Sequence, residues 1–255
     1  VLSRFMYFGR RLVREMLRSL YRDHFESPIK QKLRRANGNT KDVDLIRRLY
    51  IEELRRTKFL GVGNPAESGA HLLYYFRQIN RLPKDLFADL SSAFEPQGRS
   101  GMKVGYVARN PKISRYIFFD DLVGSGTQVS DYLATCLPSI RSESPAVELQ
   151  YLCLFGTSKG MDKVNEPGLF NGNSKCLFFL DSSYKAFEST SRYFSSAPDW
   201  FSKDKMREIA EHYGKKLWKD EPLGYKDGQL LLSFPHNTPD NSPPIFWDEG
   251  FFVPW

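Results

Sequence analysis

Between residues 58 and 234 the chain alternates short apolar runs with segments of helical periodicity, and this alternation limits the possible folds more than any other feature. The apolar runs have the length of buried strands and cover Lys58–Gly63, Lys103–Ala108, Arg115–Phe119, Val147–Phe155, Lys175–Leu180 and Leu230–Phe234. Helical patterns occupy Ala70–Arg81, Val129–Leu137 and Lys203–Trp218. Buried strands that alternate with helices are typical of a mainly parallel sheet with helices on both faces. The sequence therefore predicts an α/β fold for residues 58–255.

The run Tyr116–Val129 joins an apolar strand to a helix through the polar turn Gly-Ser-Gly-Thr-Gln. In open α/β sheets, ligands bind at the carboxyl ends of the strands, where this turn begins. Its two glycines allow a tight turn in which successive N–H groups converge on an anion, and the following helix adds unpaired N–H donors. The sequence therefore predicts a phosphate site formed by Gly124, Ser125, Gly126, Thr127 and Gln128.

Two adjacent carboxylates, Asp120 and Asp121, come directly before this turn. They would repel a phosphate, so they suit a different part of the ligand. Carboxylates accept hydrogen bonds from the hydroxyl groups of a sugar such as ribose, and they also bind magnesium. A strand–turn–helix joint with a solvated Asp pair would give part of the same pattern, but the full order of apolar strand, acid pair and glycine turn is more specific.

This run resembles the signature of type I phosphoribosyltransferases, in which an apolar strand, two acids and a small-Thr-Gly-x-Thr loop bind phosphoribosyl diphosphate. The resemblance implies that Asp120 and Asp121 are the catalytic acids, contact the ribose hydroxyls and hold Mg²⁺. It also implies that Gly124–Gln128 binds the 5′-phosphate. The sequence departs from the signature twice, because Ser125 and Gln128 stand where the family more often has Thr.

A second glycine-containing joint, Phe59–Ala70, lies earlier in the chain. In the phosphoribosyltransferases that the chain resembles, such a loop holds the diphosphate, which assigns Ser68 and Gly69 to that group. A serine N-cap on the next helix would explain the same residues equally well. The segment Arg99–Lys103 lies where those enzymes often have a mobile active-site loop, although exposed loop charge is an equal explanation.

The turn-rich tail Phe234–Trp247 resembles the closing segment of phosphoribosyltransferase-like proteins from bacterial conflict systems. The motifs around residues 64–69 and 120–128 resemble the same group. This resemblance implies that residues 219–255 form a hood, that His236 and Asn237 line an acceptor pocket, and that the protein is an effector of anti-phage defence, with an association with retrons as one form of that role.

Residues 1–57 form a separate helical extension in this interpretation. Apolar side chains at helical spacing predict a helix over residues 2–21, and a second helix runs from about residue 40 to Arg56. Residues 1–58 hold 16 Lys or Arg against 7 Asp or Glu, whereas the whole chain has a net charge of +7. This excess favours a nucleic acid or protein partner, or it forms a solvated helix face; both interpretations stay open.

Two alternatives to a phosphoribosyltransferase follow from the same residues. Asp120–Thr127 also resembles the first motif of S-adenosylmethionine-dependent DNA methyltransferases, and Ser242-Pro243-Pro244 resembles their catalytic turn, although Ile245 replaces the aromatic residue that would stack on a flipped base. The second alternative is a catalytically degenerate domain that senses a nucleotide and docks on a partner through its basic helices.

The remaining expectations concern location. No apolar stretch approaches the ~20 residues that a membrane helix requires, so no membrane partner is expected. The three cysteines are an odd number without metal-ligand spacing, which predicts free thiols in the cytoplasm. Because the first residue is Val, further sequence is expected before it.

Overall fold

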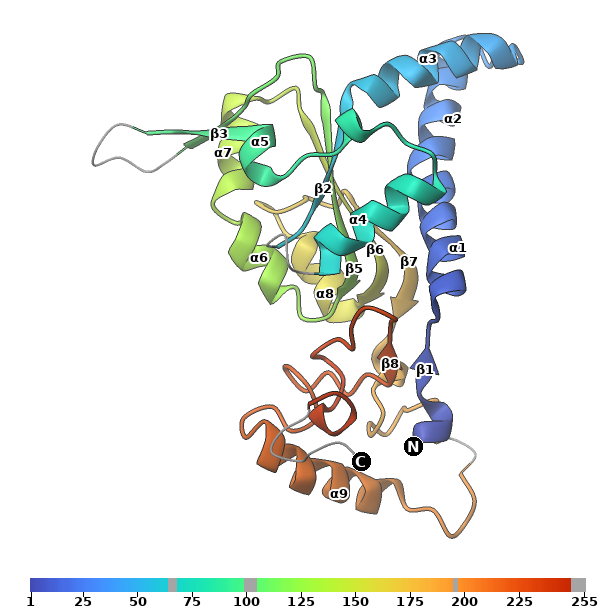
Figure 1. Cartoon of the computed structure of the whole chain (residues 1–255), viewed down its shortest axis with the longest axis vertical. Coiled ribbons are helices and arrows are strands. Elements are labelled where there is room, and N and C mark those ends of the chain that lie inside the picture. Colours follow the sequence, from blue (N-terminus) through green and yellow to red (C-terminus); the bar gives the residue numbers. More distant parts are fainter. Residues whose placement is uncertain (64–67, 99–104, 195–196, 249–255) are drawn as a thin grey trace.

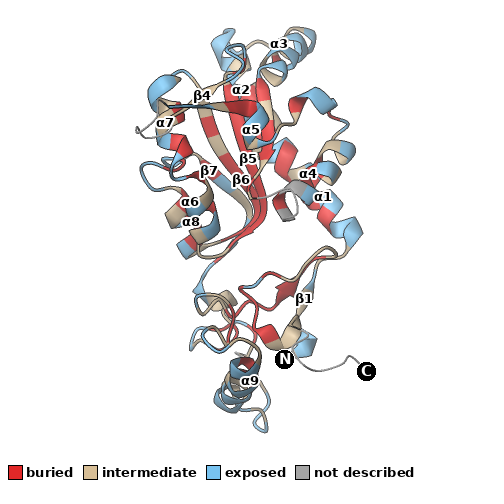
Figure 2. Ribbon diagram, turned by 60° about the vertical axis from the view of Figure 1, so that its left-hand side comes forward, coloured by how far each residue is buried: buried red, intermediate tan, exposed pale blue. Residues whose placement is uncertain are grey.

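The computed structural model describes residues 1–63, 68–98, 105–194 and 197–248, without the side chains of Ser68 and Ala70. Its centre is a parallel sheet in the order β2-β5-β6-β7 (Figure 1). These strands are β2 (Thr57–Gly61), β5 (Arg115–Val123), β6 (Glu148–Thr157) and β7 (Ser174–Leu180). All nine residues of β5 are buried (Figure 2), because the strand lies between two neighbours and beneath helices on both faces. The predicted α/β architecture with a mainly parallel sheet is confirmed.

Helices cover the two faces of this sheet, and successive strand residues point to opposite faces. Ile117 and Phe119 pack in a cluster with α4 (Ser68–Ile79), whereas Tyr116 and Phe118 pack in a cluster with helices on the other face. Those helices are α6 (Thr127–Leu133), α7 (Cys136–Glu143) and α8 (Ser158–Val164). The apolar side chains of β5 therefore stabilise both layers, which explains why this strand reads as a continuous apolar run.

The N-terminal segment differs from its prediction over residues 2–9. Instead of one helix from residue 2, the chain forms a 3₁₀ turn η1 (Leu2–Arg4) and a short strand β1 (Met6–Tyr7) before α1 (Arg10–Tyr21) begins. Strand β1 pairs in parallel with β8 (Leu232–Ser233), and the Met6 N–H donates to the Leu231 carbonyl at 2.8 Å. This long-range pairing, together with the extended backbone at Gly9, removes the first eight residues from the helix.

After α1 the chain continues as a π-helical turn η2 (Arg22–Glu26), then α2 (Ser27–Ala36) and α3 (Val43–Arg55). Val13, Leu17 and Leu20 of α1 are buried in the same cluster as Phe59 and Ile117 of the sheet. The apolar stripe of α1 thus covers part of the sheet beside α4. The basic side chains that remain exposed on α2 and α3 are Lys32, Arg34, Arg35, Arg47, Arg48 and Arg55.

A buried arginine joins α3 to the edge of the sheet where the strands begin. Arg115 of β5 donates to Glu53 of α3 at 3.2 Å and to Glu148 of β6 at 2.9 Å, and its side chain is only 7% exposed. A buried guanidinium needs such partners because its desolvation is costly. The contact fixes the N-terminal helices to the two central strands.

The C-terminal region lies beyond the carboxyl ends of the strands (Figure 1). It contains β8 and three further elements, η4 (Ser182–Tyr184), α9 (Lys203–Leu217) and η5 (Pro244–Phe246). These three pack around Phe187, Tyr193 and Leu231. The tail after β8 then returns toward the sheet. The remaining elements are η3 (Lys84–Leu86), α5 (Leu90–Ala93) and the antiparallel pair β3 (Phe94–Gln97) and β4 (Gly105–Ala108).

Two findings bear on the predicted location of the protein. Cys136 and Cys153 are buried and Cys176 is half-buried, and all three are free thiols. Among the described residues, no helix combines the length and the apolar character that crossing a membrane requires.

Candidate functional site

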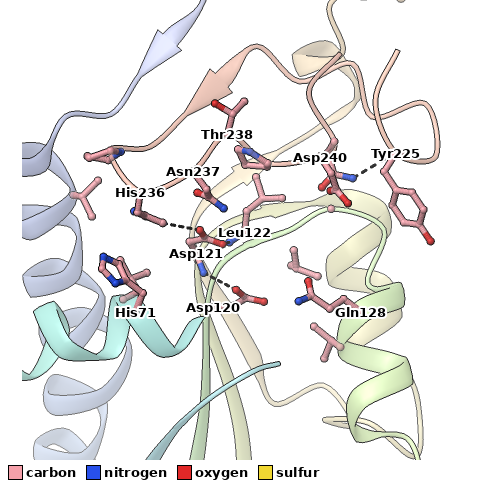
Figure 3. A pocket seen from close by; sticks show the side chains of 18 of the residues that line it. His71, Asp120, Asp121, Leu122, Gln128, Tyr225, His236, Asn237, Thr238 and Asp240 are labelled. Carbon is pink, nitrogen blue, oxygen red and sulfur yellow. Dashed lines mark hydrogen bonds and ion pairs between the residues drawn. The ribbon is translucent and has the colours of Figure 1, made fainter. Parts of the chain in front are cut away.

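A cavity of about 950 Å³ opens where β5 ends, between the helices of the sheet and the C-terminal tail (Figure 3). Its floor comes from β5 and the following turn, one wall from α1 and α4, and its roof from the tail. The residues that line it are Arg10, Val13, Arg14, His71, Leu72, Tyr75, Asp120–Gly126, Gln128, Val129, Tyr225 and Pro235–Asn241. Most of the site residues predicted from the sequence therefore share this cavity.

The two acids belong to β5 itself, because the strand continues to Val123 rather than ending before them. Each is only 3% exposed. Successive strand residues diverge, so Asp120 accepts a hydrogen bond from the Tyr151 hydroxyl at 3.4 Å whereas Asp121 contacts the tail. The Oδ1 atom of Asp120 also accepts from the Asp121 N–H at 2.9 Å.

Burial, and next the charge of Asp121, raise the pKa of Asp120 well above its ordinary value. Two carboxylates this close cannot both ionise freely in a water-poor site. Asp120 therefore keeps its proton to higher pH than an exposed aspartic acid. A buried acid pair of this kind costs stability, and such groups concentrate at functional sites.

Asp121 is held by the tail residue His236. The Nε2 atom of His236 lies 2.9 Å from Asp121 Oδ2, and Asp121 Oδ1 accepts the Leu122 N–H at 2.7 Å. The ring of His236 stacks on Phe234, with centroids 5.4 Å apart and planes 6° from parallel. Figure 3 shows this contact crossing from the roof of the cavity to its floor. The tail is thus fixed directly on one of the two acids.

The turn after β5 has the form that the sequence predicts. Gly126 has a positive φ of 74°, which favours glycine, and it caps α6. The Thr127 N–H donates to Ser125 Oγ at 3.3 Å, and Lys226 Nζ donates to Thr127 Oγ1 at 2.9 Å. The first N–H groups of α6 have no partners inside the helix and begin at this turn. The turn therefore combines backbone donors, two hydroxyls and one lysine cation.

Close packing fixes this turn from two sides. A Cβ on Gly160 of α8 would lie 2.5 Å from the carbonyl oxygens of both Val123 and Gly124. A Cβ on Gly124 would lie 2.1 Å from Asn241 Oδ1 of the tail. Thr157, the N-cap of α8, also donates to the Gly124 carbonyl. The approach of the Val123 and Gly124 carbonyls thus requires glycine at 160, whereas a Cβ at 124 would require the Asn241 side chain to move.

The second predicted loop is only partly described. A Cβ on Gly69 would meet the carbonyls of Val62 and Phe119 at 2.8 and 2.9 Å, so glycine allows α4 to begin against the sheet. Within the described residues, Gly69 is not part of the cavity lining, whereas His71, further along α4, is. Residues 64–67, the Ser68 side chain and the predicted loop Arg99–Lys103 lie outside the description.

The tail residues His236 and Asn237 both line the cavity. The Ser-Pro-Pro turn that resembles the catalytic turn of methyltransferases does not line the cavity. Ser242 is fully buried and donates to the Leu232 carbonyl at 3.1 Å, so the Ser-Pro-Pro turn serves the packing of the tail.

The family comparison separates a phosphoribosyltransferase-like protein from a methyltransferase. A family model described as PRTase-CE matches residues 1–255. The chain belongs to the PRTase-CE family. The fold is therefore phosphoribosyltransferase-like, and the family match includes the N-terminal helices as well as the sheet. No curated protein matches the chain.

Three of the solved structures that are similar to this PRTase-CE protein are named as phosphoribosyltransferases. The orotate phosphoribosyltransferase from Aeropyrum pernix is 17% identical over 50% of this chain and 63% of its own, with a TM-score of 0.30. The xanthine-guanine-hypoxanthine phosphoribosyltransferase of Helicobacter pylori is 10% identical over 69% and 84%, with a TM-score of 0.34. The purine phosphoribosyltransferase from Pyrococcus horikoshii Ot3 is 13% identical over 69% and 87%, with a TM-score of 0.31. The chain spans less than two thirds of the Aeropyrum enzyme.

Several cavity residues of this PRTase-CE chain could not be assigned to the site from the sequence. Arg10 and Arg14 of α1 stand four residues apart, so a shared helix face was foreseeable, but not that this face borders the cavity. Tyr225 comes from the segment before β8 and Asn241 from the tail. Lys226, which contacts the turn from outside the cavity lining, has a φ of +50°. No motif marks these residues, and only the long-range fold brings them to the site.

Magnesium fits this site only as an ion that the ligand helps to hold. Among the described residues, no group of three or more His, Cys, Asp or Glu side chains is placed to bind a metal. Asp120 and Asp121 offer at most two carboxylates, whereas Mg²⁺ takes six oxygen ligands and is commonly bound by one or two carboxylates together with phosphates and water. The donor set therefore suits a magnesium ion that arrives with a phosphorylated ligand.

Proposed function

We propose that the protein binds phosphoribosyl diphosphate together with Mg²⁺ and transfers or hydrolyses its phosphoribosyl group. One observation carries this proposal: the buried acid pair and the glycine turn open into the same cavity at the carboxyl end of the central strand. The turn offers N–H and hydroxyl donors to a 5′-phosphate, and the acid pair, which two apolar residues separate from the turn, accepts hydroxyl groups of a ribose. The PRTase-CE family assignment supports the same ligand class.

The residues of the chain have separate tasks in this proposal. Gly124–Gln128 anchors the 5′-phosphate, with Lys226 adding a positive charge beside Thr127. Asp120 and Asp121 orient the ribose, and the net negative charge of the acid pair stabilises positive charge that develops on the sugar. Magnesium, when bound, neutralises the diphosphate leaving group. His236 and Asn237 stand in the roof of the cavity, where an acceptor or a water molecule would approach.

The test is calorimetric titration of phosphoribosyl diphosphate with Mg²⁺ into the wild type and the Asp120→Asn, Asp121→Asn double variant. Losing two carboxylate acceptors removes hydrogen bonds worth ~1.5–3 kcal/mol each, so the affinity should fall at least ~100-fold. Asp131→Asn with Asp162→Asn is the matched control, because both acids are exposed on the helices beside the site. Equal affinity of the wild type and the site variant, with both folded by circular dichroism, would contradict the proposal.

The motif resemblance to bacterial conflict proteins extends the proposal to an effector of anti-phage defence. The corresponding test is phage plating on cells that carry the gene in its native neighbourhood. Protection that disappears with the double Asp variant but persists with the control variant supports this role. Equal plating with and without the gene, across a panel of phages, contradicts it.

A further inference from the structure

The end of the cavity opposite the glycine turn is basic. Arg10, Val13 and Arg14 of α1 line this end together with His71 and Tyr75 of α4. Figure 3 shows the two helices and His71 on one side of the acid pair and Gln128 on the other. The cavity thus has donors at the turn, carboxylates in the middle and cations at the far end.

Carboxylates of the described residues do not neutralise the charges of these two arginines. In the described part of the chain, no Asp or Glu lies within salt-bridge distance of Arg10 or Arg14, whereas Arg18, one turn further along α1, pairs with Glu15. The guanidinium of Arg14 lies 5.6 Å from the centre of the Tyr75 ring, which holds it at the wall of the cavity. Arg10 stands one turn earlier on the same helix face.

Two histidines continue this basic end toward the roof. His71 packs edge-on against Tyr75 at 5.2 Å, and its ring lies 5.8 Å from that of His236. Aromatic rings therefore link α4 and the tail across this end of the cavity. His236 in turn contacts Asp121, so the basic end adjoins the acid that is assigned to the sugar.

We propose that Arg10 and Arg14 form a second anion subsite, which binds a phosphate or diphosphate group while the Gly124–Gln128 turn holds the 5′-phosphate. This inference rests on the proposed function for the other half of the ligand. Guanidinium groups bind phosphate oxygens through two parallel N–H donors, and unpaired arginines at a cavity wall are suited to that task. The subsite selects ligands that carry anionic groups at both ends of a sugar, which is the chemistry of phosphoribosyl diphosphate or of a phosphorylated sugar beside a phosphorylated acceptor.

The experiment compares the cavity pair Arg10→Gln with Arg14→Gln against the control pair Arg11→Gln with Arg18→Gln. Both pairs remove two charges from α1, but Arg11 and Arg18 are exposed residues outside the cavity lining. Each variant is titrated with phosphoribosyl diphosphate and with ribose 5-phosphate, which lacks the second anionic group. The cavity pair should bind phosphoribosyl diphosphate ~10- to 100-fold more weakly, because charge-assisted hydrogen bonds are lost, and ribose 5-phosphate should bind as in the wild type. Equal losses in both pairs, or no loss in either, would overturn the subsite.

A second titration separates the two sources of the anion. Protein saturated with ribose 5-phosphate has its turn occupied, so a further anion must bind elsewhere in the cavity. Binding of inorganic pyrophosphate that depends on the cavity pair indicates the diphosphate of the donor, and such binding of a nucleoside 5′-monophosphate indicates the phosphate of an acceptor. Either result supports the subsite. Binding of neither anion would overturn it.

The design also separates this inference from the proposed function. A wild type that binds neither ribose 5-phosphate nor phosphoribosyl diphosphate contradicts the proposed function. In that case inorganic pyrophosphate, titrated alone, still tests the arginines. Binding that the cavity pair loses and the control pair retains supports the subsite, whereas no binding to the wild type overturns it.

Discussion

The substitution Gly160→Ala tests whether α8 holds the glycine turn in place. Gly160 lies in the first turn of α8, and its N–H donates to Thr157 Oγ1 at 3.0 Å. A Cβ at this position would lie 2.5 Å from the carbonyl oxygens of Val123 and Gly124. Non-bonded Cβ contacts below 3.0 Å are essentially never observed, so helix and turn must separate by at least about 0.5 Å.

The expected magnitude follows from this displacement. Overpacking of a close contact typically costs ~1–3 kcal/mol. For a domain of this size, each kcal/mol lowers Tm by roughly 2–4 °C, so Gly160→Ala should melt roughly 2–12 °C below the wild type. Because the turn moves relative to the acid pair, the affinity for ribose 5-phosphate should also fall by about 10-fold.

The assay is differential scanning calorimetry together with titration of ribose 5-phosphate. Gly9→Ala is the matched control, because a Cβ there would have its nearest neighbour, Tyr7 Cε1, at an ordinary 3.6 Å. As an N-cap change from Gly to Ala, the control should lose about 0.5–1 kcal/mol and should keep its affinity. Equal melting and equal affinity in the two variants would refute the claim that α8 positions the turn.

Three further predictions concern the acids, the tail and the basic helices. Because burial and Asp121 raise the pKa of Asp120, the folded state keeps a proton that the unfolded chain loses, so stability falls as pH rises from the unfolded pKa to the folded pKa. In denaturant titrations, the free energy of unfolding of Asp120→Asn relative to that of the wild type should therefore increase by ~1.4 kcal/mol per pH unit within that window. A difference that does not change with pH would contradict the raised pKa of Asp120. His236→Phe removes a hydrogen bond from the buried Asp121 and should lower the free energy of unfolding by ~1–3 kcal/mol. The exposed control His212→Phe should change it little. Equal stability of the two variants would show that the contact contributes nothing. If the exposed arginines of α2 and α3 bind a polyanion, the affinity for a single-stranded oligonucleotide should fall steeply with salt concentration. The double variant Arg34→Gln with Arg35→Gln should make that dependence on salt less steep. An affinity that does not change with salt would exclude a nucleic acid partner.

The sheet could be predicted from the sequence because its signals are local. Each strand of the parallel sheet is a short apolar run, and α4 and α9 follow helical periodicity closely. The predicted helix Val129–Leu137 instead divides into the end of α6 and the start of α7. Glycine at 126 was also foreseeable, since the turn requires a positive φ there. In such segments, local pattern and tertiary packing favour the same structure.

The pairing of β1 with β8 could not be predicted for the opposite reason. Each strand has two residues, and the paired residues lie more than 200 positions apart in the chain. Residues 2–8 have apolar spacing that also suits a helix, and only contacts with the C-terminal region select the strand. Long-range contacts override a weak local preference in this way because the preference amounts to less than ~1 kcal/mol per residue.

The candidate site also combines residues that a local motif marks with residues that only the long-range fold brings together. The acid pair and the turn occupy consecutive positions, so their shared role is visible in the sequence. Arg10, Arg14 and Lys226 are ordinary basic residues in their local context, and the excess charge of the N-terminal segment favours an external partner for the first two. The fold instead brings two of those charges to the cavity, because the buried stripe of α1 fixes which of its faces meets α4 and the tail.

A crystal structure of the protein soaked with phosphoribosyl diphosphate and Mg²⁺ would test the central claim most directly. The account predicts density for the 5′-phosphate against the N–H groups of Ser125–Gln128, with ribose hydroxyls within hydrogen-bond distance of Asp120 and Asp121. A ligand bound with its phosphate away from this turn, or a cavity that remains empty at saturating ligand, would contradict it.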